Sequence, residues 1–80
     1  MDNINDEGIL LLIEAMAHDA AEEYREYKTV LKNRALNKNE RAYFELRANE
    51  SLKFFKSNIF NLAFPNVGEY IIEQLEKEKM

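Results

Sequence analysis

The sequence predicts an all-α fold, with three main helices and one short connecting helix in a small helical bundle. Gly occurs twice and Pro once in 80 residues, and apolar residues recur at helical spacing. A chain of this length forms one domain, residues 1–80, that buries only about 60% of the surface its unfolded form exposes. Because such a core is marginal, we expect the chain to self-associate as a homo-oligomer.

The first predicted helix begins at Asn5 or Asp6 and ends near Lys32 or Asn33. Asn and Asp side chains accept hydrogen bonds from the unpaired N–H groups of a first helical turn. A stripe of apolar and small residues then follows at alternating steps of three and four, which places it on one helix face. The stripe consists of Leu10, Ile13, Ala17, Ala20, Tyr24, Tyr27 and Leu31, and is widened by Ile9, Leu12 and Met16.

The predicted length of this helix raises the question of what covers the stripe. About 28 residues at 1.5 Å each give a helix of about 42 Å, whereas a compact domain of this size has a diameter of about 30 Å. The helix therefore either kinks or extends beyond its domain into a partner. Ala17 and Ala20 permit close approach of another helix. We expect half of the stripe to be intramolecular core and half to be an assembly surface.

A loop over residues 33–39 separates the first helix from a second one at about 38–56. Three Asn residues favour the loop, and Asn37 followed by Glu40 has the spacing of an N-terminal capping box. The expected inward face of the second helix consists of Phe44, Ala48, Leu52 and Phe55, flanked by Tyr43 and Leu46.

The remaining chain predicts a short helix and a last helix. Ser57 and Asn58 interrupt the pattern, residues 59–64 form the short helix, and Pro65 disfavours helical geometry at the residue before it. Residues 66 and 69 repeat the capping-box spacing. The last helix, at about 67–78, is expected to turn Val67, Tyr70, Ile71 and Leu75 inward.

Charge is distributed unevenly along the chain. Residues 1–26 hold eight acidic and one basic residue, residues 27–56 three acidic and eight basic, and residues 57–80 four acidic and two basic, for a net charge of −4. The acidic N-terminus is unlike a signal peptide, and the apolar run 9–13 is too short to span a membrane. With no Cys in the chain, we expect a protein of the cytoplasm without a membrane partner.

A basic cluster surrounds the first interhelical loop. The helix dipole favours cations near a C-terminus, which explains Lys28 and Lys32 structurally. The alternative is an anion site for a nucleotide or phosphate, because Arg binds phosphate and aromatic rings stack on bases. The candidate ligand or partner site consists of Tyr24, Arg25, Tyr27, Lys28, Arg34 and Arg41.

No motif points to catalysis, a cofactor or a metal. His18 has Glu14 and Glu22 one turn away on either side, but no other His or Cys completes a coordination sphere, which favours a solvated helix face. Ser51 and Ser57 are the only serines, and neither lies in a nucleophile elbow. We therefore expect no enzymatic activity.

Aromatic residues gather at the end of the second helix and in the short helix after it. Phe54, Phe55, Phe60 and Phe64 lie close together in sequence, and we expect most of them to be core. The alternative is that some anchor a subunit or target, since aromatic residues dominate interface hot spots. The candidate oligomer or partner surface consists of Leu10, Ile13, Ala17, Ala20, Leu31, Phe54, Phe55 and Phe60.

Three short motifs lie between about Ala15 and Lys77. They are Ala20-x-x-Glu23-Tyr24-Arg25, Glu50-x-x-x-Phe54-Phe55-Lys56-Ser57-x-x-Phe60 and Gly68-Glu69-Tyr70-Ile71-Ile72-x-x-Leu75. In these motifs the chain resembles a family of short uncharacterised proteins from phages and prophages of Gram-positive bacteria. It departs from the family at Val67, where the pattern has Asp, and at Ile59, where Trp is common. The resemblance implies a mobile-element origin and a helical fold, with no activity transferable to particular residues.

Three functional hypotheses follow. The first is a phage-type accessory protein that binds a host protein or itself, for example to inhibit a host defence or replication component in the host cytoplasm. The second is an oligomer that sequesters an anionic nucleotide. The third is a nucleic-acid accessory protein of a phage replication module, although the net negative charge disfavours nucleic acid as a partner.

Overall fold

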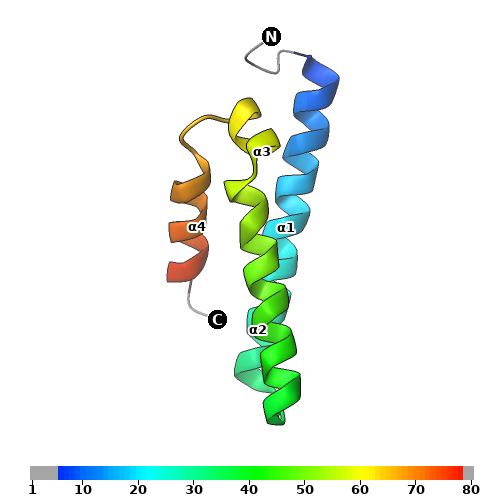
Figure 1. Ribbon diagram of the computed structural model, residues 1–80, viewed down its shortest axis with the longest axis vertical. Helices are drawn as coiled ribbons and strands as arrows, with labels where there is room; N and C mark the ends of the chain where they lie inside the picture. Colours follow the sequence, from blue (N-terminus) through cyan, green and yellow to red (C-terminus); the bar gives the residue numbers. More distant parts are fainter. Residues whose placement is uncertain (1–5, 79–80) are drawn as a thin grey trace.

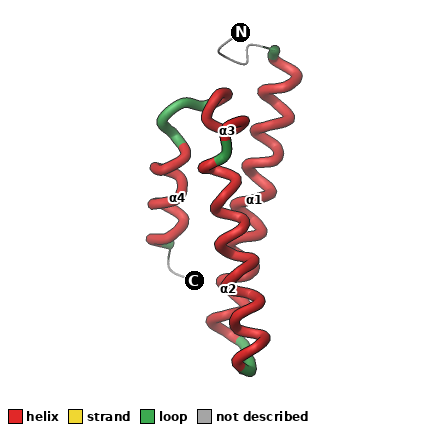
Figure 2. Tube along the Cα trace, viewed as in Figure 1, coloured by secondary structure: helices red, strands yellow, loops and turns green. Residues whose placement is uncertain are grey.

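The computed structural model describes residues 6–78, and every element among them is a helix (Figures 1 and 2). The elements are α1 (Glu7–Asn33), α2 (Lys38–Lys53), the 3₁₀ turn η1 (Phe54–Lys56), α3 (Asn58–Ala63) and α4 (Gly68–Lys77). Together α2, η1 and α3 form one bent arm that runs back along α1, and α4 lies beside that arm (Figure 1). The predicted all-α bundle is confirmed.

Helix α1 is long and uninterrupted. The Ile9 N–H donates to Asp6 Oδ1 at 3.0 Å, so Asp6 is the N-cap. The alternative start, Asn5, lies outside the described residues. The molecule measures 48 × 21 × 16 Å, so the expected compact domain of about 30 Å is wrong. Helix α1 keeps its length because the bent arm follows it over most of its course (Figure 1).

Local hydrogen bonds set the limits of the bent arm. At its start Glu40 N–H donates to Asn37 Oδ1 at 2.8 Å and Asn37 N–H donates to Glu40 Oε1 at 3.1 Å, which confirms the capping box. The α-helical part ends at Lys53 rather than near residue 56, because η1 tightens the last turn. The predicted break at Ser57 is confirmed. Its hydroxyl donates to the Phe54 carbonyl at 2.6 Å and caps α3.

Helix α4 begins differently from the prediction. Asn66 has a φ of 66°, and Val67, whose side chain cannot accept a hydrogen bond, occupies the N-cap in place of the expected capping box. Val67 and Tyr70, predicted to face inward, are 38% and 61% exposed, whereas Ile72 is buried. The reason is the rotation of α4 about its axis, which turns the 72 and 75 positions inward. The prediction for Leu75 is confirmed.

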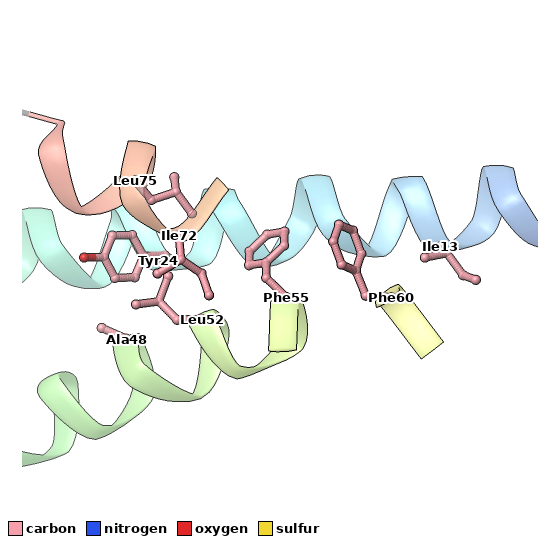
Figure 3. Packing of buried hydrophobic residues seen from close by; sticks show 8 residues of the cluster. All are labelled: Ile13, Tyr24, Ala48, Leu52, Phe55, Phe60, Ile72 and Leu75. Atoms are coloured by element: carbon pink, nitrogen blue, oxygen red, sulfur yellow. The ribbon is translucent and has the colours of Figure 1, made fainter. Parts of the chain in front are cut away.

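The core follows the seam between α1 and the bent arm. Phe55 and Phe60 are 1% and 2% exposed and pack edge to face, with ring centroids 5.3 Å apart. Farther along α1, Leu75 of α4 joins Tyr24 and Leu52 in the same cluster (Figure 3). The seven residues of the predicted stripe from Leu10 to Leu31 are buried or half-buried within the chain, whereas the three that widen it, Ile9, Leu12 and Met16, are exposed. The expectation that half of those seven residues form an assembly surface is therefore corrected.

Within residues 6–78, no helix is both long enough and apolar enough to span a membrane.

Candidate interaction groove

The structure separates the residues of the predicted ligand site. Tyr24 and Lys28 line one cleft of about 260 Å³, at the junction of α1, α2 and α4. Glu45 and Glu76 line the same cleft, so two carboxylates accompany its single ammonium group. Burial, together with the nearby negative charge of Glu76 and Glu78, raises the pKa of the Tyr24 hydroxyl above its ordinary value. This cleft is polar but not basic.

Arg25 has a structural role at the C-terminal end of α4. Its Nε and Nη2 atoms donate to the two carboxylate oxygens of Glu78, both at 2.8 Å, and Nη1 donates to Glu22 at 3.0 Å. These bonds lower the pKa of Glu78 and raise the pKa of Arg25. The guanidinium therefore ties the C-terminal end of α4 to α1, and two carboxylates already satisfy it.

The other three candidate residues lie elsewhere. The Tyr27 ring faces α2, where its centroid lies 6.1 Å from that of the Phe44 ring. The Arg47 guanidinium carbon lies over the Tyr27 ring, 5.8 Å from its centroid. Arg41 donates through Nη2 to the Leu31 carbonyl at 3.3 Å, near the end of α1. Arg34 is exposed in the loop after α1. Of the six residues, only Tyr24 and Lys28 line the 260 Å³ cleft.

The predicted partner surface is core within this chain. Ile13, Leu31, Phe55 and Phe60 are buried, while Leu10, Ala17, Ala20 and Phe54 are half-buried. This corrects their expected exposure, since residues at helical spacing identify the face a helix buries but not whether its own chain covers that face. Large apolar side chains that do remain exposed are Ile9, Leu11, Leu12, Met16, Tyr43, Leu46, Ile59, Leu62, Val67 and Tyr70.

An apolar groove opens beside the N-terminal half of α1. It has a volume of about 530 Å³, and we call it the α1 groove. Six of its eight lining residues are apolar. The full lining is Leu11, Glu14, Ala15, Ala17, His18 and Ala21 of α1, Phe55 of η1 and Ile71 of α4.

The α1 groove exists because α4 is much shorter than α1. Ten helical residues extend about 15 Å and 27 extend about 40 Å, at 1.5 Å per residue. Figure 1 shows α4 beside the middle of the molecule only, well short of the N-terminal end of α1. Ile71, in the first turn of α4, is the one α4 residue in the lining. Toward the N-terminus of α1, Ala15 and Leu11 are exposed to solvent.

Of the groove's lining residues, the predicted partner surface included only Ala17 and Phe55, although a further signal was present in the sequence. Leu11, Ala15 and His18 lie at steps of four and three, which makes a second line on α1 beside the buried stripe. The continuous apolar run over residues 9–13 indicated that this part of the helix is apolar on more than one side. His18 and Glu14 do line one site together, but no group of three or more metal-ligating residues is arranged for a metal within residues 6–78.

Comparison of the chain with protein-family models, with curated proteins and with solved structures found no match. The α1 groove is therefore interpreted from its own geometry and chemistry.

Proposed function

We propose that this chain is a small interaction protein, which acts by binding another protein through the exposed apolar surface around the N-terminal half of α1. The observation that carries the proposal is the α1 groove, an apolar concavity of about 530 Å³ with Glu14 and His18 as its polar lining residues. Exposed apolar patches with polar rims are typical of protein interaction sites. Leu11, which lines the groove, and its neighbour Leu12 are each 61% exposed.

The resemblance to phage and prophage proteins favours a partner in a bacterial host. A binder of this size acts by covering a surface that its target needs, which suits an inhibitor of a host defence or replication component. Nucleotide sequestration draws less support, because Glu45 and Glu76 share the cleft of Tyr24 and Lys28. Carboxylates in those positions repel a phosphate.

A pair of matched variants tests the proposal. Ala15 and Ala42 are both exposed helical alanines, but only Ala15 lines the α1 groove. We expect host proteins captured from a bacterial lysate by the wild type to be retained by Ala42→Arg and lost from Ala15→Arg. Light scattering coupled to size-exclusion chromatography reports self-association of the same three proteins. A strict monomer that captures nothing, or captures the same proteins after Ala15→Arg, would contradict the proposal.

A further inference from the structure

We propose that the α1 groove receives an amphipathic helix with basic flanks, supplied by another protein. This inference rests on the proposed function and adds the chemistry of the partner. Three features of the structure lead to it: the shape of the groove, the charge of its walls and the helices that this chain itself can offer.

The shape of the groove fits a helix. Leu11, Ala15 and His18 form a line along one face of α1, and alanine at its centre allows two helix axes to approach closely. Helix α4 packs against α1 farther along, where its Leu75 joins Tyr24 in the core cluster (Figure 3). The open part of the line, residues 11–21, extends about 15 Å. An occupant of about three helical turns would continue the packing that α4 begins.

The charge of the walls selects a basic occupant. Glu7, two helical turns before Glu14, lies on the same face of α1. The one basic residue within residues 6–26, Arg25, already pairs with Glu22 and Glu78. Glu14 lines the groove directly, so Lys or Arg beside the apolar face of a partner helix would lie near it. Such complementarity speeds encounter and fixes orientation.

A second copy of this chain does not offer such a helix. Two α1 segments packed across a twofold axis would bring their acidic residues together. Helix α2 carries four basic and three acidic residues, so its exposed side is nearly neutral, and its Ala48 and Leu52 already belong to the core. The basic residues at 28–34 lie at the far end of α1, where the helix turns into the loop to α2. The occupant is therefore a different protein.

Designed peptides test this inference without knowledge of the natural partner. The probe is a fluorescently labelled, covalently stapled helix of about 15 residues, with Leu and Ala on one face and Lys on both flanks. One comparison peptide carries Glu in place of Lys, and another has the residues of the basic probe in an order without an apolar face. We expect fluorescence anisotropy to show binding of the basic probe at least about tenfold tighter than either comparison peptide, and weakening with salt.

Matched variants of the full chain locate the binding. Ala15→Arg should weaken binding of the basic probe at least about tenfold, whereas Ala42→Arg should leave it unchanged. Glu14→Gln should weaken it more than Glu23→Gln, since Glu23 is exposed on α1 but lies on the opposite side, at a cleft with Arg47. Circular dichroism and urea unfolding confirm that each variant is folded.

Equal binding of the three peptides, or no effect of Ala15→Arg, would overturn the inference. So would a dimer that Ala15→Arg dissociates, because the groove would then hold a second copy. If lysate capture still depends on Ala15 while the basic probe does not bind, the proposed function stands and the stated partner chemistry is wrong. If both fail, the proposed function fails with it.

Discussion

Replacement of Gly68 by Ala tests how α4 is seated against η1. In a helix interior this replacement stabilises by up to about 1 kcal/mol. The structure predicts the opposite sign, because a Cβ at position 68 would fall on the main-chain carbonyl oxygen of Phe55. That oxygen accepts a hydrogen bond from Asn61 Nδ2 at 3.3 Å, and the Phe55 ring is only 1% exposed. The obstruction is therefore backbone that cannot easily move.

The magnitude follows from two opposing contributions. Because the added Cβ meets backbone, overpacking should cost about 2–3 kcal/mol, the upper part of the usual range, and a gain of about 1 kcal/mol in helix propensity leaves a net loss of about 1–2 kcal/mol. The midpoint of thermal unfolding should then fall by about 4–16 °C.

Urea and thermal unfolding, followed by far-ultraviolet circular dichroism, measure the loss. Gly8→Ala is the matched control, since its Cβ would meet only the Asp6 side chain, at 3.2 Å, on an exposed helix end. This control should be neutral or more stable than the wild type, by at most about 1 kcal/mol, because it gains helix propensity without a backbone clash. If Gly68→Ala is as stable as the wild type or more stable, then α4 does not approach η1 as described and the reasoning is refuted.

Three further predictions concern stability. Phe55→Ala should cost about 3–5 kcal/mol in urea unfolding because it empties the centre of the core, and a loss below about 1 kcal/mol would contradict this packing. Asn37→Ala should cost about 1 kcal/mol through loss of the N-cap, whereas Asn39→Ala in the first turn of α2 should not; equal losses would argue against the capping box. Glu78→Gln should destabilise at neutral pH. Because Arg25 lowers the pKa of folded Glu78, the wild type's advantage should disappear as pH falls below about 4, and a constant difference would show that ionisation is not involved.

The sequence by itself predicted most of the helices. Asp6, Asn37 and Ser57 accept hydrogen bonds within three residues of themselves, so the starts of α1, α2 and α3 depend on local chemistry that a sequence pattern displays. The stripe of α1 also identified the buried face correctly. The start of α4 was mispredicted because the capping-box spacing at Asn66 competes with a turn of positive φ.

Only the tertiary structure decided which apolar surfaces remain open. The rotation of α4 about its axis depends on the contact of Gly68 with Phe55 of η1, thirteen residues earlier in the chain. As a result Ile72 is buried while Tyr70 faces solvent. The reach of α4 along α1 likewise leaves Leu11 and Ala15 uncovered and creates the α1 groove. The sequence alone determined which residues form helices and which face of α1 is buried, because spacing and caps act within a few residues. Which flank stays free depends on how separate helices meet, and that is a property of the folded chain.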